Sequence, residues 1–348
     1  MSRKSDKTLT RLAPMLLAWF DTSARTLPWR SPRGVRRDPY CVWLSEIMLQ
    51  QTTVPHAAPY FTTFTARWPT VEALAAAKDE DVMQAWAGLG YYARARNLLK
   101  CAREVAARGG FPGTEGELLA LPGIGPYTAG AIAALAFGER APAVDGNAER
   151  VFARLLAMTG DWAAEKKRIG GIARDLVPAD RPGDFAEALM DLGATVCTPK
   201  SPNCPVCPLT ELCLARAEGA PERYPVKPVK IARPVRFGSA YVLRRMGQVW
   251  LVRRPPSGLL GGMLALPGPD WSETRAPSHP PLAADWTEAG EVRHVFTHFS
   301  LQLTVWTAQV RDADLPDGFW AAEDQAAGLP TVFSKAAALG GISVPRKR

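Results

Sequence analysis

Four cysteines near the middle of the chain limit most strongly what it can fold into. They are separated by six, two and five residues in the segment CTPKSPNCPVCPLTELC, as Cys197, Cys204, Cys207 and Cys213. Prolines at 199, 202, 205 and 208 prevent a continuous helix and favour a loop of tight turns. Because thiolates gathered in such a loop form a ligand set, the sequence predicts a bound metal ion or cluster.

The cysteine spacing narrows the kind of site. Structural zinc usually has two C-x2-C pairs, whereas a single pair with longer outer gaps suits a cubane iron–sulfur cluster better, so we favour a cluster and keep zinc as the alternative. Disulfides are disfavoured because the early apolar run LAPMLLAWF is short, contains Pro14 and resembles a helix rather than a secretory signal. The isolated Cys41 and Cys101 are predicted core thiols.

Length and composition indicate an ordinary globular chain. Its 348 residues are 47% hydrophobic and 22% charged, enough for two or three domains with full cores. No stretch approaches the length of a membrane span, so we expect a cytoplasmic protein without a membrane partner, which would be nucleoid-associated in a bacterium. We also expect the protein to be a monomer. The formal charge of +8 favours a polyanionic partner.

Hydrophobic periodicity divides the chain. Apolar positions three and four apart predict helices and no strand in the first part, at 71–78, 80–87, 92–108, 128–137, 148–158 and 184–194. The later part predicts a hairpin at 240–254 turning at Gly247, an alternating strand at 298–310 and a helix at 331–339. We therefore expect a helical domain over 1–222, a proline-rich basic linker over 223–235 and a smaller α+β domain over 236–348.

A glycine-containing turn joins two predicted helices before the cysteine loop. Thr114 and Glu117 form a predicted capping box, and Gly123 and Gly125 lie in the turn of LPGIGPYTAGAIAALAF. This pattern predicts a helix-hairpin-helix, whose backbone amides can hold a DNA phosphate without reading sequence; a purely structural turn is the alternative. Further on, Asp145 precedes another helix in AVDGNAERVFARLL, where a helix cap is the simplest interpretation.

Taken in order, the motifs resemble one family. They are LPW at 27–29, WLSEIMLQQT at 43–52, GLGYYARARNL at 88–98, LPGIG at 121–125, VDGN at 144–147 and the cysteine loop. Together they resemble the adenine DNA glycosylases of the MutY type, in the helix-hairpin-helix glycosylase superfamily, over essentially the entire chain. The resemblance implies hydrolysis of the N-glycosidic bond of adenine mispaired with 8-oxoguanine or guanine in double-stranded DNA. It also implies one 4Fe-4S cluster on the four cysteines.

Two carboxylates carry the predicted chemistry. A helical register places Glu46 between the apolar Val42 and Leu49, and desolvation there should raise its pKa. A carboxyl that keeps its proton near neutrality can donate to a purine ring nitrogen, so Glu46 is the acid candidate. The departing base leaves an oxocarbenium-like sugar, beside which an ionised carboxylate is needed. The resemblance assigns that role to Asp145.

Further site residues follow from the resemblance. Tyr127 occupies the position where related bifunctional glycosylases carry a lysine nucleophile, and because a phenol cannot form an imine, an intact strand is expected after excision. The resemblance places Gln51 and Tyr91 in the base stack, Trp29, Arg30 and Glu187 around the adenine, and Gly123, Gly125 and Asn147 at the DNA. On the helix of GLGYYARARNL, Arg94, Arg96 and Lys100 are candidate phosphate contacts.

The C-terminal domain resembles a Nudix fold, beginning with RPPSGLLGGMLALPG at 254–268. Between Pro267 and Phe296 there is no R-E-x-x-E-E run, so magnesium-dependent pyrophosphate hydrolysis is not expected. In the family this domain contacts 8-oxoguanine through a Phe-Ser-His loop. Here the loop is Phe296-Thr297-His298, and Thr297 keeps the hydroxyl while adding a methyl group. We expect Thr297 and His298 to meet the damaged base.

Two other functions compete with this interpretation. An endonuclease III-like glycosylase-lyase for oxidised pyrimidines would share the hairpin and the cluster, but the tyrosine at 127 and the additional domain argue against it. A non-catalytic DNA-binding protein that uses the cluster structurally is the second alternative. The retention of Glu46 and Asp145 argues against that one.

Overall fold

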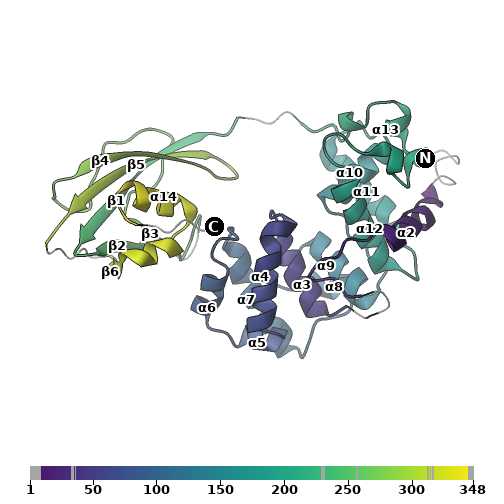
Figure 1. Ribbon diagram of the computed structural model, residues 1–348, viewed down its shortest axis with the longest axis horizontal. Coiled ribbons are helices and arrows are strands. Elements are labelled where there is room, and N and C mark those ends of the chain that lie inside the picture. Colours follow the sequence, from purple (N-terminus) through teal and green to yellow (C-terminus); the bar gives the residue numbers. More distant parts are fainter. Residues whose placement is uncertain are drawn as a thin grey trace. The chain divides into compact units, whose positions relative to one another are not determined.

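The computed structural model describes residues 9–32, 35, 37–228, 232–255, 258–311, 313, 315 and 317–343. It separates into two compact units, Met1–Val229 and Lys230–Arg348 (Figure 1). The predicted domain boundaries at 222 and 236 lie on either side of this division and stay predictions. Within the described ranges, no helix is long and apolar enough to cross a membrane.

The first unit is helical, and no strand occurs in its described residues. Its first half contains α2 (Leu12–Ser23), α3 (Pro39–Leu49), α4 (Val54–Arg67), α5 (Val71–Ala75), α6 (Asp79–Ala85), α7 (Ala93–Ala107) and α8 (Glu115–Leu118). Its second half contains α9 (Pro126–Ile132) with the π-helical turn η1 (Ala133–Phe137), α10 (Gly146–Leu155), α11 (Trp162–Leu176), α12 (Pro182–Thr195) and α13 (Leu214–Ala217). Every helix predicted from periodicity is present, whereas α4, α11 and the short α13 were not predicted.

Two hydrophobic cores hold this unit together. One surrounds the fully buried Trp43 and Trp86 and takes residues from α3, α4, α7 and α9. The other surrounds Phe152 and takes residues from α2, α10, α11 and α12. Because Ala186 lies in the first core and Leu189 in the second, α12 packs against both. This helix therefore fixes the two halves of the unit to each other.

The predicted helix-hairpin-helix is formed by α8, a turn and α9. Thr114 caps α8 by accepting from the Glu117 backbone amide at 3.3 Å, and its hydroxyl donates to the Glu117 carboxylate at 2.6 Å. In a capping box the Glu117 carboxylate would accept from the Thr114 backbone amide. Here it accepts from the Thr114 hydroxyl instead. Gly123 has φ +76°, and a Cβ there would lie 2.8 Å from Cβ of Asn97, so only glycine fits this turn.

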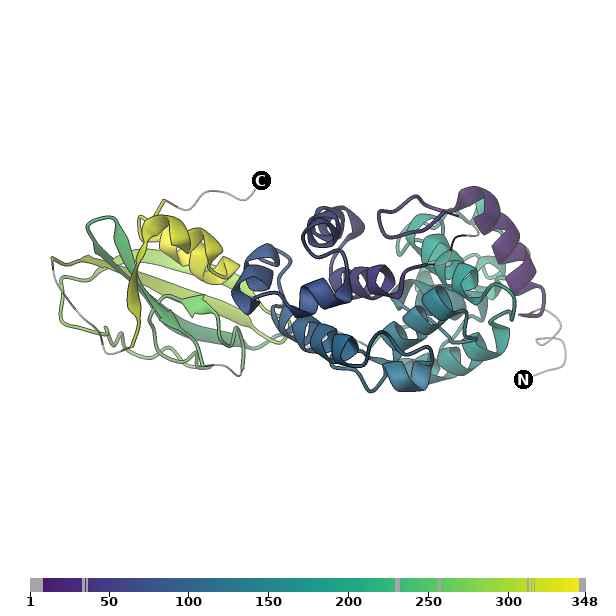
Figure 2. The ribbon, with the colours of Figure 1, turned by 90° about the horizontal axis from the view of Figure 1, so that it is seen from below.

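The second unit is a mixed sheet with one covering helix. Its strands are β1 (Val235–Arg245), β2 (Gln248–Arg253), β3 (Leu264–Ala265), β4 (Thr287–Val295), β5 (Ser300–Gln309) and β6 (Phe319–Ala322), followed by η5 (Glu323–Gly328) and α14 (Thr331–Leu339). The strand order is β3-β2-β1-β5-β4, with β6 paired to β2. Among these described strands, only β1 and β5 pair in parallel. Figure 2 shows α14 lying across one face of the sheet.

Local sequence explains this unit. Met246 and Gly247 have φ of 43° and 77°, the left-handed pair of a two-residue hairpin, which confirms the predicted turn. Leu301, Leu303 and Val305 are buried on one face of β5, which confirms the alternating strand. The helix predicted at 331–339 is α14. Residues 267–286, where the glutamate-rich sequence of a Nudix hydrolase is missing, form no helix.

Candidate active site

Glu46 lies on α3 inside the helical unit. Its side chain is buried, with the residue 6% exposed, and its Oε2 accepts a hydrogen bond of 2.7 Å from the Tyr127 hydroxyl. Burial raises the pKa of Glu46 to about 7, while the Tyr127 hydrogen bond opposes the rise and the charges of Asp145 and Glu187 add to it. The carboxyl therefore holds its proton over much of the neutral range, as its apolar neighbours predicted.

Tyr127 brings the helix-hairpin-helix to this carboxyl. It lies in the first turn of α9, and its hydroxyl is also 3.9 Å from Sδ of Met190. Burial and the neighbouring Glu46 charge raise the pKa of Tyr127 well above its usual value, so the phenol stays protonated and donates. The hairpin and α3 are therefore joined at the candidate acid itself.

Asp145 is the N-cap of α10, as the simplest interpretation of its sequence predicted. Its Oδ1 accepts from the backbone amide of Ala148 at 2.7 Å, and its Oδ2 accepts from Nδ2 of Asn147 at 2.8 Å. The charge of Asp145 also contributes to the raised pKa of Glu46. The same side chain thus caps a helix and adds a negative charge to the candidate site.

Two arginines tie α10 to the cysteine loop. Arg150 donates to Oδ1 of Asn147 at 2.8 Å and to the carbonyls of Gly193 and Cys197 at 2.7 and 2.8 Å. One turn later, the buried Arg154 donates to the carbonyls of Thr198 and Pro199 at 2.7 and 2.9 Å and to Sγ of Cys197 at 3.3 Å. Sequence reasoning missed both arginines, and their only signal was a four-residue spacing in ERVFAR.

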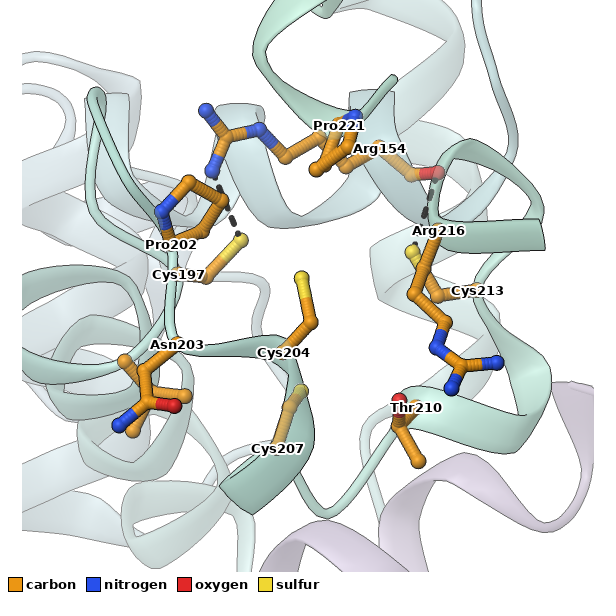
Figure 3. A pocket seen from close by; sticks show the side chains of 11 residues that line it. Arg154, Cys197, Pro202, Asn203, Cys204, Cys207, Thr210, Cys213, Arg216 and Pro221 are labelled. Carbon is orange, nitrogen blue, oxygen red and sulfur yellow. Dashed lines mark hydrogen bonds between the residues drawn. The ribbon is translucent and has the colours of Figure 1, made fainter. Parts of the chain in front are cut away.

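The four predicted ligand cysteines line one pocket (Figure 3). Short 3-10 turns, η2 (Cys204–Val206) and η3 (Thr210–Leu212), shape its wall, and Arg154 and Arg216 also line it. No three His, Cys, Asp or Glu side chains in the described ranges are arranged to hold a single metal ion. Burial raises the pKa of the Cys207 thiol to about 12. Cys101 is buried and Cys41 packs against the first core, as predicted for core thiols.

Glu187 is buried and Arg30 is largely shielded, with a side chain 10% exposed, so neither is a solvated charge. Arg30 makes a two-pronged contact with Asp191, from Nη1 to Oδ2 at 2.7 Å and from Nη2 to Oδ1 at 2.8 Å, and its Nε lies 3.6 Å from Oε1 of Glu187. Glu187 also accepts from Arg37 at 2.8 Å. Trp29 is half-buried, with its ring edge-on to Phe61 at 5.6 Å. Sequence reasoning missed Asp191, a fully buried acid on the apolar face of α12.

Gln51 and Tyr91 are exposed at the ends of two loops, and both have left-handed backbones, with φ of 57° and 47°. Arg94 donates to carbonyls in the last turn of α3 and in these two loops, and its expected contact with a phosphate stays a prediction. Arg96 and Lys100 follow on α7, where Lys100 is exposed. The two loop tips and the arginine between them form one local structure.

Thr297 and His298 lie at the tip of the β4–β5 hairpin in the second unit, and both are exposed. The turn is closed by a hydrogen bond of 2.9 Å from the Phe296 amide to the Phe299 carbonyl. Phe296 and Phe299 anchor it by packing against Trp271, with ring centroids 5.5 and 6.1 Å apart. The hairpin thus presents two polar side chains on an aromatic base.

Similar proteins share both units. Residues 44–178 match the HhH-GPD superfamily of base excision DNA repair proteins, and residues 239–339 match the NUDIX domain. The solved structure of a thermostable thymine-DNA glycosylase aligns with a TM-score of 0.55 and 30% identity, over 61% of this chain and 98% of that one. An endonuclease III–DNA complex, at 23% identity and a TM-score of 0.52, shares the fold.

These matches define a DNA glycosylase of base excision repair, with a Nudix-like unit after the catalytic fold. The human adenine DNA glycosylase is 36% identical over 364 residues, which cover 86% of this chain and 67% of that protein. The adenine DNA glycosylase of Mycolicibacterium smegmatis is 42% identical over 208 residues, covering 59% of this chain and 70% of that protein. The chain belongs to the adenine DNA glycosylases, hydrolases of N-glycosyl bonds that act on DNA.

Proposed function

We propose that this enzyme removes adenine mispaired with 8-oxoguanine or guanine, with Glu46 as the general acid. The observation that carries the proposal is the buried Glu46 carboxyl, whose pKa of about 7 keeps a proton available at neutral pH. A general acid works best when its pKa lies near the working pH. Proton donation to a ring nitrogen of adenine makes the neutral base a better leaving group.

Asp145 supplies the opposite electrostatic need. As the base departs, positive charge develops on the sugar, and an ionised carboxylate close to it lowers the energy of that state. Asp145 accepts hydrogen bonds from Ala148 and Asn147, which hold its side chain at the start of α10. The proposed pair is therefore one carboxyl that burial keeps protonated and a second acid, Asp145, that two hydrogen bonds hold in place.

The proposed reaction ends with an intact abasic strand. Tyr127 donates to Glu46 and its phenol cannot form an imine with the sugar, so water is the final acceptor. Extrusion of adenine from the duplex brings it to Trp29, Arg30 and Glu187, where the buried charges fix its polar edge. Gln51 and Tyr91 occupy the disturbed stack, and the turn at Gly123 and Gly125, with Asn147, faces the DNA backbone.

One 4Fe-4S cluster would be held by Cys197, Cys204, Cys207 and Cys213. The residues fit this group because the four cysteines line one pocket and the Arg154 guanidinium, 3.3 Å from Sγ of Cys197, places a positive charge beside the ligand set. When bound, a cluster crosslinks the loop and so stabilises the fold around it. The contacts of Arg150 and Arg154 join that loop to α10, which begins at Asp145.

Thr297 and His298 are proposed to meet 8-oxoguanine. They are the exposed tip of a hairpin held by Phe296, Phe299 and Trp271. A rigid base lets two polar side chains keep one orientation, which favours specific hydrogen bonds over adaptable ones. The Thr297 hydroxyl can donate and accept, so it suits a lesion edge that carries both kinds of group.

The decisive experiment measures excision on matched duplexes. We expect abasic sites from 8-oxoguanine:adenine and guanine:adenine duplexes, and none from a duplex with an oxidised pyrimidine. Borohydride should trap no covalent complex, since no imine forms. Efficient trapping, or excision of the pyrimidine only, would favour the endonuclease III-like alternative.

A separate measurement tests the cofactor. Iron analysis should give about four irons per chain, and the protein should absorb visible light. Stoichiometric zinc in a colourless protein would contradict the cluster.

A further inference from the structure

One guanidinium joins the two exposed loop tips of the helical unit. Nη1 of Arg94 donates to the carbonyls of Ile47 and Met48 at 3.0 and 3.1 Å and to that of Gln50. Nη2 donates to the carbonyls of Leu89 and Gly90 at 3.0 and 3.4 Å and to the Thr52 hydroxyl at 3.4 Å. The side chain is thus committed to backbone groups on both sides.

The contacts on the Nη1 side close a helix. Ile47 and Met48 lie in the last turn of α3, whose carbonyls have no partner within the helix. A cation at a helix C-terminus also interacts favourably with the helix dipole. Burial lowers the pKa of Arg94 to about 10, which still leaves it charged at neutral pH. Arg94 therefore caps the C-terminus of α3, the helix that carries Glu46.

The two loops have the same relation to Arg94. Gln50 precedes Gln51 and Gly90 precedes Tyr91, so each left-handed residue directly follows a carbonyl that the guanidinium holds. The Arg94 guanidinium also lies 5.4 Å from the Tyr91 ring centroid. Left-handed residues other than glycine are strained and persist only where their surroundings hold them. Arg94 is the shared support of both.

We infer that Arg94 is a positioning residue that holds Gln51 and Tyr91 as one preorganised unit for entry into the DNA stack. The inference rests on the proposed function, in which these two residues occupy the stack while adenine is extruded. Because Gln51 and Tyr91 are already held in place, no binding energy is needed to order their two loops when DNA binds. Arg94 thus contributes to extruding the base, without touching it.

The test compares two arginines of α7. Arg94→Lys keeps the charge but cannot span both loops, because an ammonium lacks the planar fork. Arg103→Lys is the matched control: Arg103 donates to the carbonyls of Ala75 and Ala77, both at 3.4 Å, and to Asp79. Under single-turnover conditions Arg94→Lys should slow excision from a guanine:adenine duplex about tenfold, and Arg103→Lys should not. Excision of adenine from an unpaired bulge should be slowed less by Arg94→Lys, because that base is easier to extrude.

Three readouts separate this role from simple destabilisation. Combined with Tyr91→Ala, Arg94→Lys should add little further loss, because both act on one unit. Fluorescence of 2-aminopurine at the target site should show that Arg94→Lys unstacks the base less than wild type does. This signal reports base extrusion independently of excision. If wild type excised no adenine, the proposed function would be refuted, and the fluorescence would still test the role of Arg94. Hydrogen exchange of the wild type should show amides 50–52 and 89–92 opening together. Additive losses, equal slowing on the bulge, or independent opening would overturn the inference.

Discussion

The surroundings of Glu46 and the tip of the β4–β5 hairpin are built in opposite ways. Glu46 is 6% exposed, accepts a hydrogen bond from Tyr127 and has a pKa that burial has moved to about 7. Thr297 and His298 are exposed on a loop whose aromatic base is buried at Phe299 and half-buried at Phe296. The comparison teaches that the fold alone sets the chemistry of the first region. The second acquires its chemistry only when a partner desolvates it.

Buried charge marks the first region. Asp191 is fully buried and holds Arg30 through two hydrogen bonds and Arg25 through two more. Desolvating such ions is expensive, and apolar residues could fill the same space at no loss of stability. In the same unit Glu46 and Tyr127, whose pKa values burial raises, share a hydrogen bond, and such perturbed groups are typical of functional sites. The helical unit therefore buries charges whose desolvation costs free energy.

The largest expected effect comes from Glu46→Gln, which removes the proton but keeps the shape. Excision should fall by about 10²–10⁴-fold under single-turnover conditions, the usual contribution of a general acid. Binding to an 8-oxoguanine:adenine duplex should remain close to wild type, because the DNA surface is unchanged. Wild-type turnover by this variant would show that the fold around Glu46 does not create an acid.

The same substitution has a pH-dependent effect on stability. The folded-state pKa of Glu46 is raised to about 7 from 4.5, so the native protein binds its proton more tightly than the unfolded chain does. Stability is then lost as pH rises from about 4.5 to 7, by about 3 kcal/mol. A glutamine amide cannot ionise, so the free energy of unfolding of Glu46→Gln should not fall in this way. In thermal unfolding, the stability of the variant relative to wild type should therefore increase between about pH 5 and pH 8. An advantage that is constant with pH would contradict the raised pKa.

Asp145→Asn separates the charge of Asp145 from its cap. Asparagine caps helices about as well as aspartate, so the bond to Ala148 should persist, and the melting temperature should fall by no more than the loss of the single Asn147 hydrogen bond requires. Removing the charge should slow excision by about 10²–10³-fold, as expected for loss of an electrostatic group in a transition state. Asp161→Asn is the control, since Asp161 caps α11 by accepting from Ala164 at 3.0 Å. A loss of stability that matches the loss of rate would indicate that Asp145 is only a cap.

Tyr127→Phe tests the donor that opposes burial. The Tyr127 hydrogen bond lowers the pKa of Glu46 relative to burial alone, so its removal should raise that pKa. Because the acid works when protonated, excision should fall off at a higher pH in the variant than in wild type. Tyr40→Phe serves as the control, since the Tyr40 hydroxyl donates to the Trp68 carbonyl at 2.7 Å, not to Glu46. A falloff at unchanged or lower pH would exclude Tyr127 as the tuning group.

Sequence predicted the elements whose information is local. Most helices of the first unit, the Met246–Gly247 turn and the strand at 300–309 follow from periodicity and turn residues. The burial of Glu46 followed from its apolar neighbours on α3. The family resemblance added the pairing with Asp145, which residue spacing alone could not supply.

What sequence could not predict depends on segments distant in the chain. Arg94, Arg150 and Arg154 are ordinary surface candidates by composition, yet each donates to backbone carbonyls from other segments. A carbonyl acceptor leaves no residue-type signal, because every residue has one. Asp191 is similarly hidden, since its partners Arg25 and Arg30 lie 166 and 161 residues earlier. The supports of the site are therefore less visible than the reacting groups.

The smallest expected effect belongs to the exposed hairpin. Thr297→Val keeps the shape of the side chain and removes its hydroxyl, so a group on 8-oxoguanine would lose its partner in the bound state. Preference for 8-oxoguanine:adenine over guanine:adenine should fall by about 1 kcal/mol, roughly fivefold. Thr297→Ser should retain the preference.

Thr287→Val, at the exposed start of β4, is the matched control for a lost hydroxyl on the same strand pair. The ratio of the two single-turnover rates checks the prediction, because phosphate contacts from the helical unit act equally on both duplexes and cancel in that ratio. Equal ratios for wild type, Thr297→Val and Thr297→Ser would show that the hairpin does not recognise the lesion. Discrimination would then depend on Gln51 and Tyr91, and the helical unit would both recognise the mispair and excise the base.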